Sequence, residues 1–245
     1  MTLAVTALGT SGMFATDDVA CSAYLIEWDG FKLWLDAGAG TWQRLLAVID
    51  YRELSGILLT HRHPDHTTDV FQALHARYLG THGKLAPIPL WAPQETLDLL
   101  VGFDEDMAEA FELRSVTGSE RLDLNGGSVS FVRMAHPVET LGVRIEAAGG
   151  VVAFSADSGP NADFSTLVSG ADLFLCEATL QAGATWEGHL NGAQAGALGA
   201  ALGAGRTLLT HLPPERDHAL TLEEARAAAP GSLVELAEQG RRYEV

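Results

Sequence analysis

Four potential metal ligands stand within six residues of this 245-residue chain, directly after an apolar segment. Residues 56–60 read as a buried strand, and the loop that follows carries His61, His63, Asp65 and His66. Alternate side chains of an extended segment point the same way, so His61 and His63 are placed to share one ion. Asp65 and His66 then turn toward a second ion. The alternative is a polar loop that is rich in histidine by chance, but the chain has only nine histidines, and their clustering favours a metal site.

Three further strand ends deliver a metal-binding residue type in the same manner. These residues are His136, Asp157 and His211. The letters Leu-Leu-Thr-His occur twice, once ending at His61 and once at His211. Taken singly, such residues are more often caps or surface groups, but together they complete the set that two ions need. Thr60 and Thr210, each next to a ligand, are candidates to fix the histidine tautomers.

The expected elements form two similar runs of strands and helices. Strands are expected at residues 3–8, 22–28, 31–36, 56–60, 88–91, 127–134, 142–147, 151–155, 172–176 and 207–210. Helices are expected at residues 41–49, 68–79, 94–101, 161–168, 192–202 and 222–229. Asp29 and Gly30 suit a type I′ turn between two strands, and Thr41 is expected to cap the first helix. Two such runs predict two layered sheets with helices outside, in a single domain over residues 1–245.

Composition limits the partners and the compartment. The net charge of −17 opposes binding to long nucleic acids, which are held by clustered Lys and Arg. Cys21 and Cys176 lie far apart without metal-ligand spacing, which fits a reducing compartment. The first residues show neither a signal peptide nor a membrane span, so a cytoplasmic protein without membrane contact is expected. The acidic residues 104–109 are expected to form solvated surface.

The order His-x-His-x-Asp-His, followed by a histidine, an aspartate and a histidine, resembles the metallo-β-lactamase superfamily over nearly the whole chain. The resemblance implies an α+β fold, a four-layer αββα sandwich with a site for two divalent metal ions at one edge. In that family the first ion is held by the residues matching His61, His63 and His136. The second ion is held by those matching Asp65, His66 and His211, and the residue matching Asp157 bridges the two. Zinc is the expected metal for this imidazole-rich set, with manganese or iron as alternatives.

Two more motifs resemble the ribonuclease Z-like phosphodiesterase branch of that superfamily. They are Leu-Cys-Glu-Ala-Thr, which contains Glu177, and Gly-His-Leu-Asn, which contains His189. In that branch the residue matching His189 protonates the leaving oxygen, and the residue matching Glu177 orients it. The alternative is that Glu177 caps a strand end and His189 is an ordinary loop residue. Asp65, His189 and Glu177 are the expected catalytic residues.

The expected substrate is a small phosphodiester. Ribonuclease Z enzymes that mature tRNA carry a long arm between the positions of His136 and Asp157, whereas only a short hairpin-like stretch fits here. Residues 135–145 and 173–178 are most similar to the atypical class II cyclic-nucleotide phosphodiesterases. The resemblance therefore implies hydrolysis of a cyclic nucleotide-like phosphodiester by a hydroxide that bridges two metals. It also implies a homodimer.

Other functions remain open at this point. They are ribonuclease Z-like RNA processing, lactone or thioester hydrolysis, and a non-catalytic binding protein on the same fold. His189 and Glu177 disfavour lactones and thioesters, which need less help from a positioned acid, and the complete ligand set disfavours a silent fold. Antibiotic hydrolysis is disfavoured because Asp157 stands where many secreted β-lactamases of this fold use cysteine. Trp186, near His189, is able either to stack on a substrate ring or to anchor a loop.

Overall fold

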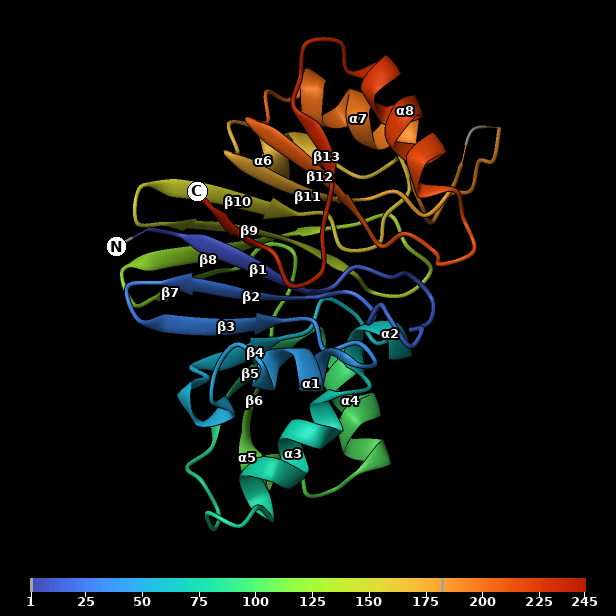
Figure 1. The fold of residues 1–245 in the computed structure, drawn as a ribbon. Coiled ribbons are helices and arrows are strands. Elements are labelled where there is room, and N and C mark those ends of the chain that lie inside the picture. Colours follow the sequence, from blue (N-terminus) through green and yellow to red (C-terminus); the bar gives the residue numbers. More distant parts are fainter. Residues whose placement is uncertain (1, 182) are drawn as a thin grey trace.

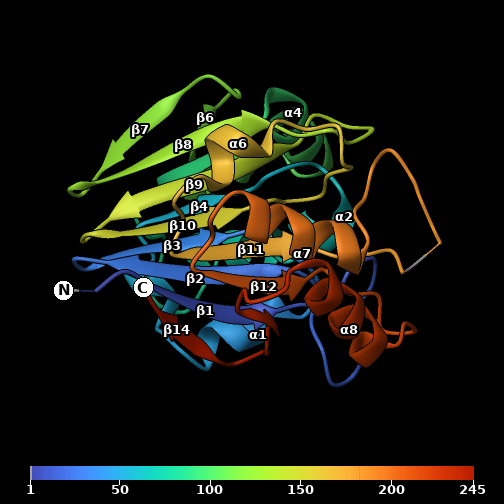
Figure 2. The same ribbon diagram turned by 90° about the horizontal axis from the view of Figure 1, so that it is seen from above.

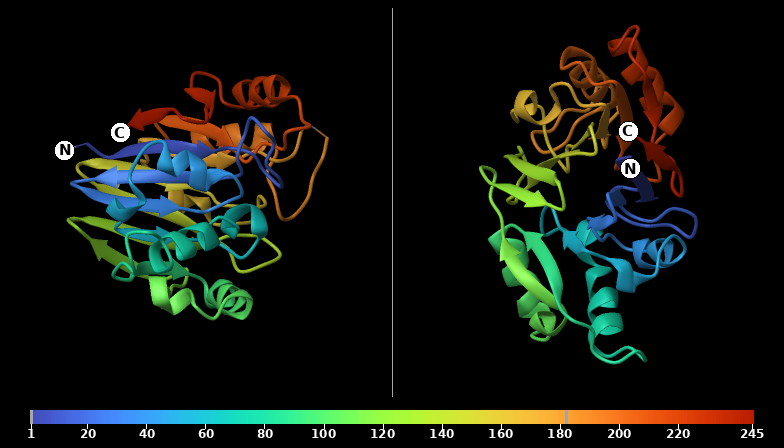
Figure 3. Two further views of the ribbon diagram at one scale, coloured as in Figure 1. Left: turned by 60° about the horizontal axis from the view of Figure 1, so that its bottom comes forward. Right: turned by 90° about the vertical axis from the view of Figure 1, so that its left-hand side faces the viewer.

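The computed structural model describes residues 2–181 and 183–245, and their strands form two seven-stranded sheets that pack face to face (Figure 1). The first sheet contains, in spatial order, β14 (Arg242–Glu244), β1 (Ala4–Gly9), β2 (Ala23–Trp28), β3 (Phe31–Leu35), β4 (Gly56–Leu58), β5 (Ile88–Ala92) and β6 (Phe111–Ser115). The second contains β13 (Val234–Leu236), β12 (Arg206–Thr210), β11 (Leu173–Glu177), β10 (Gly150–Phe154), β9 (Leu141–Ala147), β8 (Gly127–Arg133) and β7 (Arg121–Leu124). The ends of the chain lie side by side because β14 pairs with β1 (Figure 3).

Helices cover the outer face of each sheet (Figures 1 and 2). The helices beside the first sheet are α1 (Thr41–Leu46), the short 3₁₀ helix η1 (Tyr51–Glu53), α2 (Pro64–Thr67), α3 (Val70–Tyr78), α4 (Gln94–Phe103) and α5 (Met107–Ala110). Those beside the second sheet are α6 (Phe164–Val168), α7 (Gly192–Ala201) and α8 (His218–Ala228). The predicted four-layer αββα sandwich is confirmed. Within the described residues, no helix combines the length and the apolar character that crossing a membrane requires.

The apolar core has one layer between the sheets and one under each set of helices. Tyr24 and Ile26 of β2 face the second sheet, where the Tyr24 ring lies 5.2 Å from that of Phe154. Leu25, between them in sequence, points the other way and packs under the helices. Strands buried on both faces read as continuous apolar runs, which is why the central strands are visible in the sequence.

Several local expectations can be compared with the structure. The type I′ turn is confirmed, since Asp29 and Gly30 have φ angles of 45° and 84°. The capping role given to Thr41 is wrong. Gly40, with a φ of 85°, precedes the helix, and the Thr41 hydroxyl donates to the Gly38 carbonyl at 2.7 Å. Residues 104–106 lie largely at the surface as expected, but the acidic stretch also contains the fully buried Met107.

Candidate metal centre

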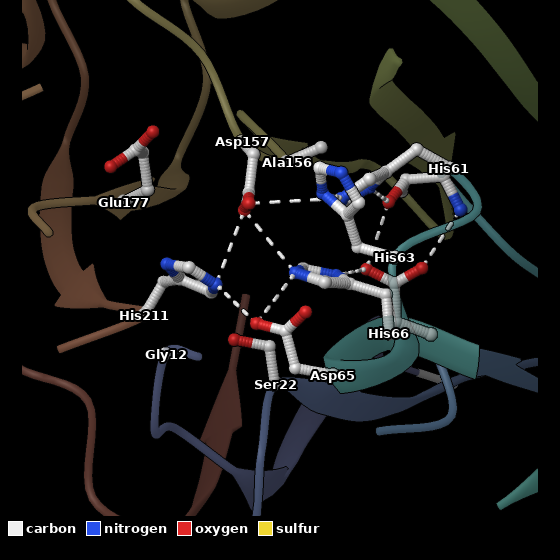
Figure 4. Close-up of polar contacts among 12 residues, drawn as sticks. Gly12, Ser22, His61, His63, Asp65, His66, Ala156, Asp157, Glu177 and His211 are labelled. Carbon is white, nitrogen blue, oxygen red and sulfur yellow. Dashed lines mark hydrogen bonds and ion pairs between the residues drawn. The ribbon is translucent and has the colours of Figure 1, made fainter. Parts of the chain in front are cut away.

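The strand ends that carry the candidate ligands meet at one edge of the sandwich (Figure 4). His61 lies just beyond β4, and α2 begins directly after His63, which places Asp65 and His66 on its first turn. The second sheet contributes His136 beyond β8, Asp157 beyond β10 and His211 beyond β12. Strands β10, β11 and β12 run parallel, so their carboxyl ends lie at the same edge.

The first group of ligand atoms comes from three histidines. His63 Nδ1 lies 3.1 Å from His61 Nε2 and 3.2 Å from His136 Nε2. Asp157 Oδ2 completes the group at 3.7 Å from His61 Nε2 and 3.9 Å from His136 Nε2.

The second group mixes carboxylate and imidazole. Asp65 Oδ2 lies 3.2 Å from His211 Nε2 and 3.8 Å from His66 Nε2. The other oxygen of Asp157, Oδ1, lies 3.3 Å from His66 Nε2 and 3.4 Å from His211 Nε2. The two oxygens of Asp157 therefore face different groups, and Figure 4 shows the contacts that lead from Asp157 to histidines of both.

These residues fit a divalent metal centre. His66 Nε2 and Asp157 Oδ1 are fully buried, and neither has a hydrogen-bond partner among the described residues. Buried polar atoms of a native protein are nearly always paired, so these two need a partner from outside the chain. The ligand atoms of His61, His63, His136 and Asp157 lie within 4.8 Å of one another, and so do those of Asp65, His66 and His211. Sets of imidazole nitrogens and carboxylate oxygens are typical of zinc and related cations.

The ionisation states of the first group and of Asp157 suit metal binding. Burial lowers the pKa of His61, His63 and His136, so these imidazoles stay neutral. Burial opposes ionisation of Asp157, but His211 and His66 outweigh it and lower the pKa of that carboxyl. Neutral imidazole and ionised carboxylate are the forms that coordinate a cation. His66 differs, because Asp157 and Asp36 outweigh the effect of burial and raise its pKa, so a cation bound there would displace a proton.

Asp36 is a central residue of the site that the sequence reasoning missed. It is fully buried just beyond β3, where its Oδ2 accepts hydrogen bonds from His66 Nδ1 at 2.7 Å and from the Thr60 hydroxyl at 3.0 Å. Because the Thr60 hydroxyl donates its hydrogen to Asp36, the Thr60 oxygen is free to accept a hydrogen bond from His61 Nδ1 at 3.0 Å. One carboxylate therefore orients two candidate ligands, His66 directly and His61 through Thr60. The sequence signal for Asp36 was its position at the end of an apolar strand, where Asp157 also lies.

Glu177, the last residue of β11, makes an equivalent arrangement in the second sheet. Its Oε1 accepts hydrogen bonds from His189 Nδ1 and from the Ser158 backbone N–H, each at 2.7 Å. Its Oε2 accepts from the Thr179 hydroxyl at 2.8 Å, and the Thr179 oxygen accepts from His211 Nδ1 at 2.8 Å. Burial disfavours the charged form of His189, but the Glu177 carboxylate outweighs it and raises the pKa of His189.

The role suggested for Thr210 is wrong. Its hydroxyl is hydrogen-bonded to the Tyr24 hydroxyl, and Thr179 orients His211 instead. The expectation for Thr60 agrees with its contacts to Asp36 and His61. His136 Nδ1 donates to the carbonyl of Gly188 at 2.9 Å. Each histidine that is held at Nδ1 by the chain presents Nε2 to the centre, whereas His63 presents Nδ1.

Three non-glycine residues around the centre have a strained backbone. Asp36, Ala156 and His211 adopt left-handed φ angles of 57°, 50° and 55°. Non-glycine residues rarely adopt this conformation, and it occurs mainly where the surrounding structure requires it. Gly12 packs against the His211 ring so closely that a Cβ at this position would lie 2.7 Å from Nδ1. The strained turns and the glycine fix where the side chains enter the site.

Trp186 stands at the rim of the centre. Its ring centroid lies 5.0 Å from that of His189 and 6.2 Å from that of His136, and about half of the residue is exposed. It forms part of the wall of a cavity of about 320 Å³ together with Pro137 and Asn161. This position is compatible with both roles considered for Trp186.

Comparison with known sequences places the chain in a family. The sequence profile of the β-lactamase superfamily domain matches residues 31–212. A probable metallo-hydrolase of Bacillus subtilis, YhfI, is 28% identical over 98% of this chain and 99% of its own length. The uncharacterized protein Rv1339 of Mycobacterium tuberculosis is 30% identical over 94% of this chain and 88% of its own. A ribonuclease Z of Mycobacterium avium is 28% identical over 86% of each chain.

Solved structures agree with this placement. The crystal structure of YhfI superposes with a TM-score of 0.90 at 25% identity over 99% of each chain. A diphosphatase of the PhnP family gives a TM-score of 0.81 at 22% identity, covering 100% of this chain and 98% of that one. Yeast PDE1 gives a TM-score of 0.79 at 15% identity, covering 100% of this chain and 99% of that one. The chain therefore belongs to the β-lactamase superfamily, as a metallo-hydrolase with the metallo-β-lactamase fold.

Proposed function

We propose that this protein is a phosphodiesterase that hydrolyses a small, cyclic nucleotide-like phosphodiester with two divalent cations. The observation that carries the proposal is the position of His189. Glu177 accepts a hydrogen bond from His189 Nδ1 at 2.7 Å. A ring nitrogen of His189 lies within 4.8 Å of the ligand atoms of Asp157 and His211. An imidazolium beside the metal centre is suited to protonate an alkoxide leaving group, which departs poorly without a proton.

The ligand atoms divide between two ions. We assign the first ion to His61, His63 and His136. We assign the second to Asp65, His66 and His211. The two oxygens of Asp157 support a bridging role, since they face different groups. We propose zinc, with manganese or iron as alternatives for the same ligands. When bound, such cations activate water for attack on phosphorus and stabilise the charge of the in-line transition state.

The chain itself handles the proton of the leaving group. Glu177 accepts from His189 Nδ1, which leaves Nε2 to carry the proton that is transferred as the P–O bond breaks. The raised pKa of His189 keeps this proton in place before the reaction. Asp65 Oδ2 accepts a hydrogen bond from the backbone N–H of Met13 at 2.8 Å. We propose that Asp65 positions the attacking water and also holds an ion.

Several observations support a small substrate over tRNA. Between His136 and Asp157 the chain forms only β9 and its hairpin with β10. The net charge of −17 disfavours an extended phosphate backbone. Relatives of the same fold include a diphosphatase and yeast PDE1, alongside ribonuclease Z, and these names place phosphate chemistry within the superfamily.

A substrate panel tests the proposal. Enzyme loaded with zinc or manganese is assayed against 3′,5′-cyclic nucleotides, bis(p-nitrophenyl) phosphate, precursor tRNA, a lactone and a thioester. We expect hydrolysis of the cyclic nucleotide or another small phosphodiester, without appreciable cleavage of precursor tRNA. Efficient, site-specific trimming of precursor tRNA at physiological salt would overturn the substrate assignment. Turnover of only the lactone or thioester would overturn the phosphodiesterase assignment.

The role of His189 is tested with two substrates that differ in leaving group. A ribose alkoxide needs a proton, whereas p-nitrophenolate leaves readily without one. His189→Ala should lower kcat for a cyclic nucleotide by roughly 10²–10⁴, the usual range for a positioned acid, with a far smaller change for a p-nitrophenyl diester. Metal content should stay at the wild-type level. His66→Ala is the contrasting variant, because it should lose metal and slow both substrates. Equal slowing and metal loss in His189→Ala would make His189 a ligand.

A further inference from the structure

A second cavity, of about 530 Å³, shares a wall with the candidate metal centre. It is formed where α2 and the start of α3 face the last turn of α4, on the outer side of the first sheet (Figure 1). We name it the side pocket and define it by Arg62, His63, Thr68, Phe71, Leu99 and Phe103. Its volume lies in the range of about 300–1,000 Å³ that is typical of small-molecule sites.

His63 connects the side pocket to the centre. His63 is one of the residues that line the pocket, and its Nδ1 lies 3.1 Å from His61 Nε2 within the first ligand group. A group seated in the pocket therefore lies beside a residue of the candidate metal centre. Two such neighbouring positions are close enough to bind two parts of one small molecule.

One half of the side pocket is apolar and aromatic. The rings of Phe71 and Phe103 lie 4.7 Å apart and are tilted by 47°. Phe103 is 77% exposed and Leu99 is 42% exposed, although both are large apolar residues. Exposed apolar side chains gathered around a concave surface mark binding sites more often than isolated ones do.

The other half of the side pocket contains Arg62, whose guanidinium is only loosely paired. The charged neighbour described for Arg62 is Glu95, whose Oε1 lies 3.6 Å from Arg62 Nε, beyond hydrogen-bond distance. Among the residues that the structure describes, no acceptor is hydrogen-bonded to this guanidinium. In a chain of net charge −17, an arginine that stands between two candidate ligand histidines and pairs only loosely with Glu95 favours an anion or a ring with acceptor atoms.

We propose that the side pocket binds the planar aromatic group of the phosphodiester, a nucleobase or a ring system of similar size. The ring packs against Phe71 and Phe103, and Arg62 at the mouth of the pocket donates hydrogen bonds to the anionic phosphate. The assignment rests on the proposed phosphodiesterase activity and adds its specificity. We assign Phe103 as the specificity-determining residue. It is also the best residue to substitute, because it is exposed on α4 and contributes little to the core.

The test compares two substrates with the same scissile bond. One is 3′,5′-cyclic AMP, and the other is the 3′,5′-cyclic phosphate of methyl ribofuranoside, which lacks the base. Wild-type enzyme should prefer the base-bearing substrate. Phe103→Ala should lower kcat/KM for cyclic AMP about tenfold, mainly through KM, because stacking on one aromatic side chain has about this effect. Its kcat/KM for the base-free substrate should be unchanged.

Val101→Ala is the matched control, since Val101 is 41% exposed on the same helix and does not contribute to the pocket wall. An equal loss on both substrates in Phe103→Ala, or the same loss in Val101→Ala, would overturn the proposal. So would a change of oligomeric state in Phe103→Ala on gel filtration, which would make the surface a contact between copies of the chain. If wild-type enzyme hydrolyses bis(p-nitrophenyl) phosphate but neither cyclic diester, this assignment alone is overturned. If it hydrolyses none of the three phosphodiesters, the proposed phosphodiesterase activity is overturned as well.

Discussion

Each of the two sheets supplies one buried carboxylate that orients histidines, and these two carboxylates, Asp36 and Glu177, are used in the same way. Asp36, beyond β3, accepts from His66 Nδ1 at 2.7 Å and reaches a second histidine through the hydroxyl of Thr60. Glu177, at the end of β11, accepts from His189 Nδ1 at 2.7 Å and reaches a second histidine through the hydroxyl of Thr179. Each sheet therefore fixes a pair of histidines by the same hydrogen-bond pattern.

The two directly held histidines differ in their surroundings. The His66 side chain is fully buried, and its Nε2 faces Asp65 and Asp157 with no hydrogen-bond partner of its own. The His189 side chain is 13% exposed and lies beside the half-exposed Trp186, at the open side of the centre. We therefore infer that one hydrogen-bond pattern serves two purposes. Deep burial suits a ligand, whereas access to solvent and substrate suits an acid.

The largest effect should follow from substituting Asp157, whose two oxygens face the two groups of candidate ligands. Asp157→Ala should lose most of one ion and nearly all activity, because a bridging carboxylate serves both centres. Metal analysis of wild-type enzyme after loading with excess metal should give two ions per chain. A wild-type stoichiometry of one ion or fewer would contradict the two-metal assignment.

An intermediate effect should separate the two carboxylates. Asp36→Asn should weaken metal binding by about 10–100-fold, the usual effect of losing a partner that orients ligands, because it disturbs His66 and His61 together. Glu177→Gln should act mainly on kcat, with a larger loss for a cyclic nucleotide than for a p-nitrophenyl diester. Metal titration and the two assays measure both quantities. If both variants lose metal equally and keep the same substrate ratio, the two halves do not differ as we infer.

The smallest effect should come from the threonine hydroxyls. Thr60→Val and Thr179→Val each remove the hydroxyl that links a buried carboxylate to one candidate ligand, so metal affinity should fall by about tenfold, the lower end of such effects. Thr210→Val is the control. It removes the partner of the buried Tyr24 hydroxyl and should lower the melting temperature without changing metal affinity. A loss of metal affinity in Thr210→Val as large as in Thr179→Val would contradict the assignment.

The strands that could not be predicted from the sequence share one property. They are β6, β7, β13 and β14, which are the outermost strands of the two sheets. An edge strand pairs on one side only and buries less of its surface, as the mostly exposed β7 shows. Its sequence therefore lacks the apolar run that identifies a central strand. The layered fold was predictable because the central strands are buried on both faces.

The candidate ligands could be predicted because they follow strong strands or form a compact motif. The residues that orient them could not. Asp36 lies 30 positions from His66, and Thr179 lies 32 positions from His211, so no local pattern connects them. The repeated letters Leu-Leu-Thr-His suggested equal roles for Thr60 and Thr210, but the chain turns differently after the two strands. The side pocket was missed for the same reason, since Phe71 and Phe103 belong to different helices.

The double use of Asp36 has a consequence for how this site tolerates sequence change. His61 and His66 belong to different ligand groups, yet both depend on the same buried carboxylate. Asp36, Thr60 and His66 share one hydrogen-bond network, so the effects of substitutions at these positions should not add. A lineage that loses Asp36 would lose the support of both histidines in one step, and restoring only one of the two interactions would leave the other histidine without its partner. Of the residues in this half of the centre, Asp36 should therefore be the least free to change.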